Sequence, residues 1–276
     1  MAFDIGRFFD VDRDIYKEKG VTVYQFKDEL VDEFVNDFLV PFRQAYISDE
    51  DLNNGIDNKV WKSKSEAVSE QIPTKANLKS GEFSEILMYF LCINFHCPDA
   101  NVTPMKWRWK ETQDMPCHLS DIVLLKCLDE YNPSEDDYMF LLESKGRAVV
   151  LSDGNRTSSM NAGIDGALKD RVSRAGKLVA YMRSKYNHDH LFSLARKVKR
   201  FSEPVDEDFI EYKKFFNAAI VVDRLSLDKH IDNIKPEKLK KAQEKEINLI
   251  AVPLCGMKRV YERMYEGILN IEDGTE

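Results

Sequence analysis

The sequence is short of the features that define several classes of protein. Its five cysteines are odd in number and include no Cys-x-x-Cys spacing, which disfavours a disulfide framework and a cysteine-rich zinc site. Basic residues are outnumbered by acidic ones, 40 to 48, so the formal charge of −8 gives the whole molecule no long-range attraction to a polyanion. No apolar run approaches the roughly 18 residues that cross a bilayer, and the first residues lack the basic start of a signal peptide. We therefore expect a soluble protein of a reducing cytoplasm, with no membrane association.

The composition is that of a globular protein. Hydrophobic residues make up 43% of the 276 positions, and 16 Phe and 11 Tyr supply large apolar surfaces. With 12 Gly and 9 Pro, low complexity is excluded. Alternation predicts a strand at residues 21–26, and helical spacing of apolar residues predicts a helix at 29–43.

The middle of the chain predicts a helix, three strands and a long helix. The first helix covers residues 79–91, with Ser80 as a possible N-cap. The strands fall at 105–110, 119–128 and 138–150, and the Asn132-Pro-Ser turn joins the last two as a hairpin. One face of the long helix is formed by Ile164, Leu168, Val172, Ala175, Val179 and Met182.

The last third predicts two buried strands and two helices. Residues 215–222 and 247–254 are nearly continuous apolar runs, as expected for strands covered on both faces. A charged helix at 236–246 separates them, and another helix follows at 257–269. This order indicates an α/β protein, with an N-terminal α/β extension at 1–77 and an α/β domain at 78–276.

Strand geometry groups three of the charged residues. Side chains at i and i+2 of a strand share a face, so Glu143 and Lys145 project together, and the hairpin brings Asp121 beside them. Carboxylates hold Mg²⁺ through hard oxygen ligands, and a lysine offsets negative charge in a transition state. This combination suits metal-assisted phosphodiester hydrolysis, with Mn²⁺ as a possible substitute for Mg²⁺. An exposed ion pair on a strand is the alternative explanation for Glu143 and Lys145.

A third acid would come from the helix at 79–91. At 100° per residue, Glu82 flanks the buried face of that helix, whereas Glu85 turns towards solvent. We therefore expect Glu82, rather than Glu85, to complete or orient the metal shell. A first-turn acid favoured by the helix dipole is the alternative for Glu82.

These residues resemble those of a known superfamily. The order Gly81-Glu82, Asp121, Glu143-x-Lys145 and a long helix resembles the PD-(D/E)xK nucleases, whose core runs α-β-β-β-α-β and is typical of restriction endonucleases. More narrowly, Ser80-Gly-Glu-Phe-Ser-Glu85 with Leu141-Leu-Glu-Ser-Lys145 resembles the HamA family, the nuclease effectors of Hachiman anti-phage defence systems. The likeness covers roughly residues 78–255. It implies a DNA-cleaving subunit that works with a helicase partner, HamB, which holds the nuclease in check until activation.

Basic residues outside the acidic group are candidates for contacts with phosphates. The segment after the long helix offers four, and two more lie on the margin of that helix. They are Arg171, Arg174, Arg196, Lys197, Lys199 and Arg200. No phosphate-binding glycine loop occurs, so we expect no nucleotide cofactor, and ATP-driven movement would come from the helicase.

The sequence therefore favours a Mg²⁺-dependent endonuclease that hydrolyses DNA within a defence complex. Asp121 and Glu143 would bind the metal, and Lys145 would assist the attacking water. Two alternatives stay open: a catalytically silent, nuclease-like DNA-binding or assembly subunit, and a ribonuclease that uses the same metal chemistry.

Overall fold

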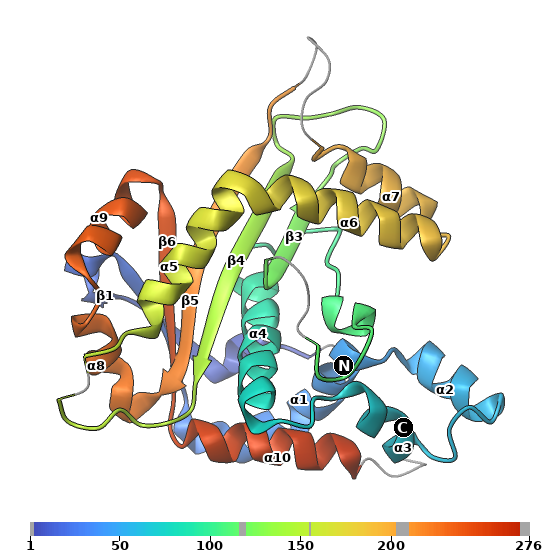
Figure 1. Ribbon diagram of the computed structural model, residues 1–276, viewed down its shortest axis with the longest axis horizontal. Helices are drawn as coiled ribbons and strands as arrows, with labels where there is room; N and C mark the ends of the chain where they lie inside the picture. The colour runs from blue at the N-terminus through green and yellow to red at the C-terminus, as the bar shows by residue number, and fades with distance from the viewer. Residues whose placement is uncertain (1–2, 116–119, 155, 203–209, 271–276) are drawn as a thin grey trace.

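The protein is built on one mixed six-stranded sheet (Figure 1). The computed structural model describes residues 3–115, 120–154, 156–202 and 210–270. The strand order is β1-β2-β6-β5-β4-β3. The four strands β2, β6, β5 and β4 are mutually parallel, and β1 and β3 close the two edges by antiparallel pairing. The bounds are β1 Phe9–Tyr16, β2 Val21–Phe26, β3 Ile122–Lys126, β4 Tyr138–Arg147, β5 Lys213–Asp223 and β6 Ile247–Leu254.

Helices cover both faces of this sheet. In Figure 1, α5 and α6 run across the strands at the front, while α1, α4 and α10 lie on the other side. The helix bounds are α1 Val31–Tyr46, α2 Asp49–Asp57, α3 Lys64–Gln71, α4 Ala76–Phe95, α5 Ser159–Lys169, α6 Ala175–His188, α7 Phe192–Lys199, α8 Leu227–Asp232, α9 Pro236–Glu244 and α10 Met257–Leu269. This arrangement confirms the expected α/β class.

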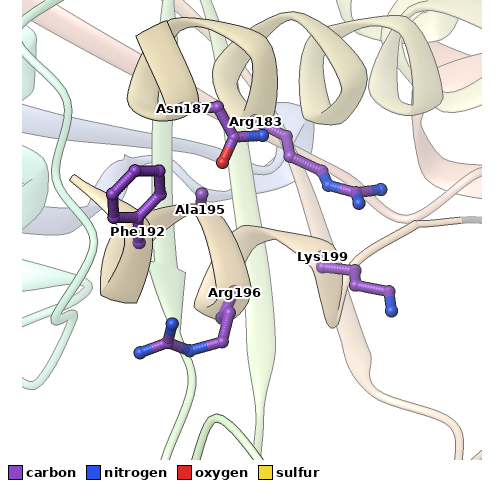
Figure 2. Close-up of a pocket in the computed structure, with 6 residues that line it drawn as sticks. All are labelled: Arg183, Asn187, Phe192, Ala195, Arg196 and Lys199. Atoms are coloured by element: carbon purple, nitrogen blue, oxygen red, sulfur yellow. The ribbon is translucent and has the colours of Figure 1, made fainter. Parts of the chain in front are cut away.

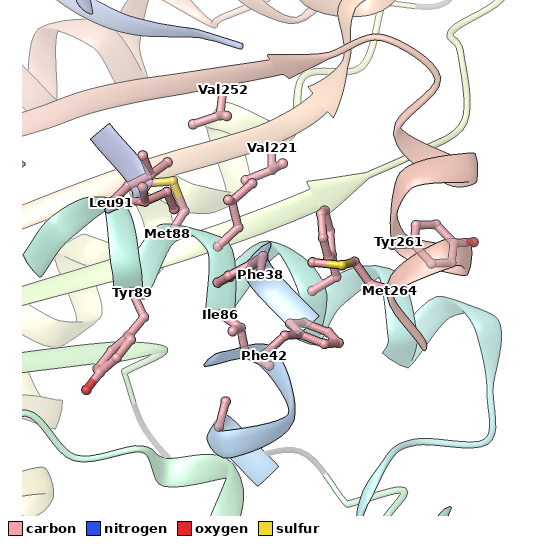
Figure 3. Close-up of a cluster of buried hydrophobic side chains, with 14 of the residues drawn as sticks. Phe38, Phe42, Ile86, Met88, Tyr89, Leu91, Val221, Val252, Tyr261 and Met264 are labelled. Carbon is pink, nitrogen blue, oxygen red and sulfur yellow. The ribbon is translucent and has the colours of Figure 1, made fainter. Parts of the chain in front are cut away.

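Each face of the sheet has its own hydrophobic core. One core joins α1, α4 and α10 to the sheet, and aromatic rings such as Phe38 and Phe42 meet Met264 and Ile86 there (Figure 3). The other core places α5, α6, α7 and α9 against the opposite face. Because both faces are covered, β5 and β6 are apolar along nearly their whole length, as the sequence predicted.

The prediction of a strand at residues 105–110 is wrong. Lys106–Trp109 forms a 3-10 helix, and an isolated bridge between Val102 and Leu125 contacts the edge of β3 instead. In a 3-10 helix, residues two apart point in different directions. Trp107 therefore packs on Tyr89 in one core, while Trp109 packs against two tyrosines of α6. The alternation of tryptophan and arginine reflects this division and not a strand.

The helix expected at 79–91 is longer at both ends. It begins after Lys75 and continues to Phe95, so Ser80 is not its N-cap. Ser80 lies in the second turn, where its carbonyl accepts a hydrogen bond from the Ser84 hydroxyl at 2.7 Å.

The long helix expected around residues 164–182 is interrupted. A π-helical turn at Asp170–Arg174 joins α5 to α6 and shifts the face that points inward. Ile164, Val179 and Met182 are buried as expected, but Val172 is 82% exposed. The wider turn brings polar residues to the inner side, which matters for the site described next.

The N-terminal region shares the same sheet. The strand at 21–26 is confirmed as β2, and its pairing with β6 is parallel, with Val21 opposite Leu249. The helix expected at 29–43 corresponds to α1, which contains Pro41. Within the described residues, no helix is long and apolar enough to cross a membrane.

Candidate active site

The β3–β4 hairpin places two of the expected carboxylates side by side. Ile122 pairs with Leu142 in antiparallel register, so Asp121 stands opposite Glu143 just before β3 begins. Asp121 Oδ2 accepts a hydrogen bond from the backbone N–H of Ser144 at 2.8 Å, which fixes the carboxylate against β4. The expected hairpin and the expected neighbourhood of these two acids are both present.

Lys145 bridges the two acids. Its Nζ lies 2.7 Å from Glu143 Oε1 and 3.7 Å from Asp121 Oδ2. Burial lowers the pKa of Lys145, but the carboxylates of Asp121, Glu143 and Glu85 outweigh that effect, so its pKa is raised and it stays protonated. The Lys145 side chain is 35% exposed, so it is partly open to solvent.

The π-helical turn adds a second cation and a further acid. Arg174 Nη1 donates to Glu143 Oε2 at 3.2 Å and to Asp170 Oδ1 at 3.4 Å. Asp170 is almost fully buried, and burial raises its pKa to about 6 although the nearby Ser120 hydroxyl acts in the opposite direction. The sequence analysis missed Asp170, because nothing in the residue pattern marks where a helix widens into a π turn.

The helix acid that faces this group is Glu85. The expectation that Glu85 turns towards solvent is wrong: it is half-buried, and its Oε2 accepts a hydrogen bond from Trp107 Nε1 at 3.2 Å. Burial and the Asp121 carboxylate raise the pKa of Glu85 well above its usual range. The helix-face argument failed because α4 is buried on nearly all sides and has no solvent face at this position.

Glu82 has a different partner. Its Oε1 accepts a hydrogen bond from Lys110 Nζ at 2.7 Å, and both side chains are at most 7% exposed. Burial raises the pKa of Glu82, with the Lys110 charge acting against that shift. Lys110 is the main charge acting on this carboxylate, whereas the main charge acting on Glu85 is Asp121. The structure therefore brings Asp121, Glu143 and Lys145 together as expected, with Glu85 rather than Glu82 as the helix acid.

Two glycines let helices approach β4 at backbone distance on both sides of the site. A Cβ on Gly166 of α5 would stand 2.5 Å from Glu143 Oε1, so α5 lies directly over this carboxylate. On the other face, a Cβ on Gly146 would stand 2.1 Å from Ser84 Oγ of α4. Glu143 is thus enclosed by the fold and held in place by its neighbours.

The resulting cluster contains more negative than positive groups. We call Glu85, Asp121, Glu143 and Asp170 the acidic cluster. Burial and then the Glu143 charge raise the pKa of Asp121 to about 6, as expected where carboxylates crowd together. A divalent cation relieves such repulsion, and hard carboxylate oxygens are the donors that Mg²⁺ prefers.

The donor chemistry of the acidic cluster therefore fits Mg²⁺ or Mn²⁺, and Asp121 and Glu143 are the residues that would hold it. In this conformation, however, both Glu143 oxygens are engaged by cations, Lys145 and Arg174. Among the residues that the structure describes, no three His, Cys, Asp or Glu side chains are already arranged as a metal-binding group.

The six basic residues expected to contact phosphates differ in their surroundings. Arg174 forms ion pairs with two members of the acidic cluster, and the Arg171 guanidinium lies over the Phe216 ring at 5.3 Å. Arg200 forms a buried pair with Asp137 at 2.8 Å and, with 5% of its side chain exposed, serves the fold. The remaining three, Arg196, Lys197 and Lys199, lie on α7, where Arg196 and Lys199 are exposed and Lys197 is half-buried.

The fold and this site define an α/β protein that gathers carboxylates and a lysine at one end of a sheet hairpin. Comparison with family models matches the HamA model over residues 6–268, nearly the whole chain. The chain therefore belongs to the HamA family and is a component of the Hachiman anti-phage defence systems. A search of curated proteins found no match.

Proposed function

We propose that the protein is a metal-dependent deoxyribonuclease, the effector subunit of a Hachiman complex that also contains a HamB-like helicase. The observation that carries the proposal is the convergence of Asp121, Glu143 and Lys145 beside Glu85. Lys145 contacts both strand acids, and the pKa of Asp121 is raised to about 6 by burial and the Glu143 charge. Family membership over residues 6–268 supports the defence role, and the PD-(D/E)xK core stays an inference from the motif.

Each residue of the site has a role in this proposal. Asp121 and Glu143 would hold the metal with help from Glu85, and the bound metal would supply Lewis acidity at the phosphate. The Lys145 ammonium is protonated and partly exposed, so it orients the attacking water and offsets charge that develops on the phosphate oxygens. Arg174 holds Glu143 from the opposite side and balances the charge of Asp170.

Cleavage assays on DNA with Mg²⁺ or Mn²⁺ test the proposal. Glu143→Ala and Lys145→Ala are each expected to lower the cleavage rate by about 100-fold or more, because each removes a charged group from the reacting centre. A second acid-x-Lys pattern, Glu211 and Lys213, provides matched controls, because both residues are exposed at the start of β5. Glu211→Ala and Lys213→Ala are expected to cleave like the wild type.

Metal binding is measured separately from cleavage. Calorimetric titration with Mn²⁺ is expected to show binding that weakens at least about tenfold in Asp121→Asn and Glu143→Ala. Equal cleavage by the wild type and both site variants, in the presence of the helicase, would overturn the proposal. Parallel assays on RNA of the same sequence decide between the two nucleic acids.

One observation favours a second candidate, a catalytically silent nuclease-like subunit. Both oxygens of Glu143 are already satisfied by Lys145 and Arg174, which is the pattern of a structural ion network. Under this alternative, Glu143→Ala would destabilise the fold, and no metal-dependent cleavage would be found in the wild type.

A further inference from the structure

A cation-rich pocket lies between α6 and α7, separate from the acidic cluster. Figure 2 shows side chains from both helices around it, with the Asn187 amide pointing into the space between them. It is lined by Arg183, Asn187, Phe192, Ala195, Arg196 and Lys199, and we call it the α6–α7 pocket. Three of these six side chains carry positive charge, and none carries negative charge.

Two of the cations have no acidic partner among the residues that the structure describes. Within the described residues, Arg183 and Lys199 form no ion pair, and both are exposed. Arg196 is partly neutralised, because its Nη2 lies 3.1 Å from Glu130 Oε1. Exposed cations without an internal counter-charge concentrate positive potential in one place, despite the net charge of −8.

Exposed aromatic rings accompany these cations. Phe192 is 54% exposed at the wall of the pocket, and Tyr131 is 71% exposed with the Arg196 guanidinium 5.7 Å from its ring centre. Aromatic faces beside cations suit unpaired bases, which stack on the ring while the backbone phosphates meet the charges. The Asn187 amide adds a donor and an acceptor for a base edge.

We propose that the α6–α7 pocket binds single-stranded DNA, with Arg183 and Lys199 on phosphates and Phe192 stacked on a base. The inference rests on the proposed function for the identity of the strand, and it adds the place where that strand lies. A duplex keeps its bases paired and offers no base face to Phe192, so the aromatic wall favours a single strand.

The π-helical turn that carries Asp170 of the acidic cluster runs directly into α6, which lines the pocket. Arg174 immediately precedes α6, and Arg183 lies nine residues further along, about 14 Å away at the helical rise of 1.5 Å per residue. A strand held at Arg183 is therefore within a few nucleotides of the acidic cluster. Binding here would position the strand for cleavage without requiring a basic surface over the rest of the molecule.

Fluorescence anisotropy with a labelled single-stranded oligonucleotide tests this inference on the full chain. The wild type is expected to bind at about 50 mM salt with a dissociation constant on the order of 10 µM. The double variant Arg183→Glu/Lys199→Glu is expected to bind at least about tenfold more weakly, and to lower the slope of log K against log salt by about 0.7 for each lost phosphate contact. Phe192→Ala is expected to weaken single-strand binding severalfold and to leave binding to a duplex of the same sequence unchanged.

Lys177→Glu is the matched control. Lys177 is exposed on the same helix but does not line the pocket, and the substitution makes the same charge change as Arg183→Glu or Lys199→Glu alone, the two single variants with which it is compared. It is expected to change the affinity less than threefold. Equal losses in the pocket variants and in Lys177→Glu, or no measurable single-strand binding by the wild type at 100 µM protein, overturn the inference.

The result is separable from the proposed function. Glu143→Ala retains the α6–α7 pocket and is expected to bind the oligonucleotide like the wild type while it fails to cleave. If the wild type cleaves DNA but the pocket variants bind the oligonucleotide as well as it does, the pocket proposal is wrong and the nuclease proposal stands. If the pocket variants lose binding but the wild type never cleaves, the nuclease proposal is wrong and the pocket proposal stands.

Discussion

The acidic cluster and the α6–α7 pocket differ in the sign of their charge and in how firmly neighbouring groups hold their charged side chains. In the cluster, every carboxylate is at least half-buried and contacts a named neighbour, as Glu143 does with Lys145 and Arg174. In the pocket, Arg183 and Lys199 reach into solvent without an ion pair among the described residues. The comparison shows that the burial and the partners of a charged residue, rather than its charge alone, indicate its role. Buried charges need partners, while exposed cations without partners are available to a ligand.

The strongest test of this contrast uses two adjacent cations at the end of α7. Arg200 is buried against Asp137, whose other oxygen accepts the Leu128 backbone N–H at 2.9 Å. Arg200→Ala is expected to lower the free energy of unfolding by about 3 kcal/mol, because it leaves a buried carboxylate without its counter-charge. Lys199→Ala is expected to change it by less than about 0.5 kcal/mol.

Urea unfolding monitored by circular dichroism measures both variants. Comparable losses in the two would show that burial does not distinguish them, and the contrast between the cluster and the pocket would lose its basis.

A smaller effect is expected from the two acids of α4. Glu85→Gln is expected to lower the single-turnover cleavage rate by about 100-fold, equivalent to about 2.7 kcal/mol, because a neutral amide replaces a carboxyl group that would help to hold the metal. Glu82→Gln is expected to change the rate less than tenfold and to lower the melting temperature instead, because it leaves Lys110 buried without a counter-charge. The reverse pattern, with Glu82 needed for cleavage and Glu85 dispensable, would restore the assignment made from helix geometry.

The smallest effect concerns a titratable side chain that is buried and forms a hydrogen bond but no ion pair. His230 is fully buried, and its Nδ1 accepts the Ser159 backbone N–H at 3.0 Å, which requires the neutral ring. Burial and then the Arg147 charge lower the pKa of His230 to about 4, below its usual value near 6.5. Above pH 6.5 the ring is mostly neutral in the folded and in the unfolded protein. Between that pH and 4 the unfolded state takes up the proton first, so stability falls with falling pH.

Comparison of the wild type with His230→Gln isolates this contribution. Between pH 7.5 and 5.0, the free energy of unfolding of the wild type is expected to fall by about 2 kcal/mol more than that of the variant. Parallel curves for the two proteins would mean that His230 is protonated equally in both states.

The sequence predicted those strands and helices in which the spacing of apolar residues follows a single regular pattern. Residues 215–222 and 247–254 are apolar apart from Asn217 and Asn248, and they lie in the central strands β5 and β6. The helix at 257–269 has a single apolar face and matches α10 residue for residue. The hairpin that unites Asp121 with Glu143 followed from the turn between two apolar runs.

The wrong predictions concern residues whose orientation is set by tertiary packing and not by the spacing of apolar residues along the chain. Helical spacing placed Glu85 in solvent, but α4 lies within a core that surrounds it, so no spacing argument could orient Glu85. The π-helical turn brought Asp170 inward and Val172 outward, and a π turn leaves no mark in the pattern of apolar residues. Trp107 and Trp109 alternate like strand residues, yet each fills a separate space in the packed molecule.

The pairing of β2 with β6 sets the order in which the molecule can be completed. Val21 lies opposite Leu249, so β2 finds its parallel neighbour only after β3, β4, β5 and the helices between them have been synthesised. Until then, the early hairpin presents an open edge that can join another nascent chain. A polypeptide released before β6 is made would lack the central strand of its sheet, so premature termination would yield material fit for degradation and not a partially active fragment.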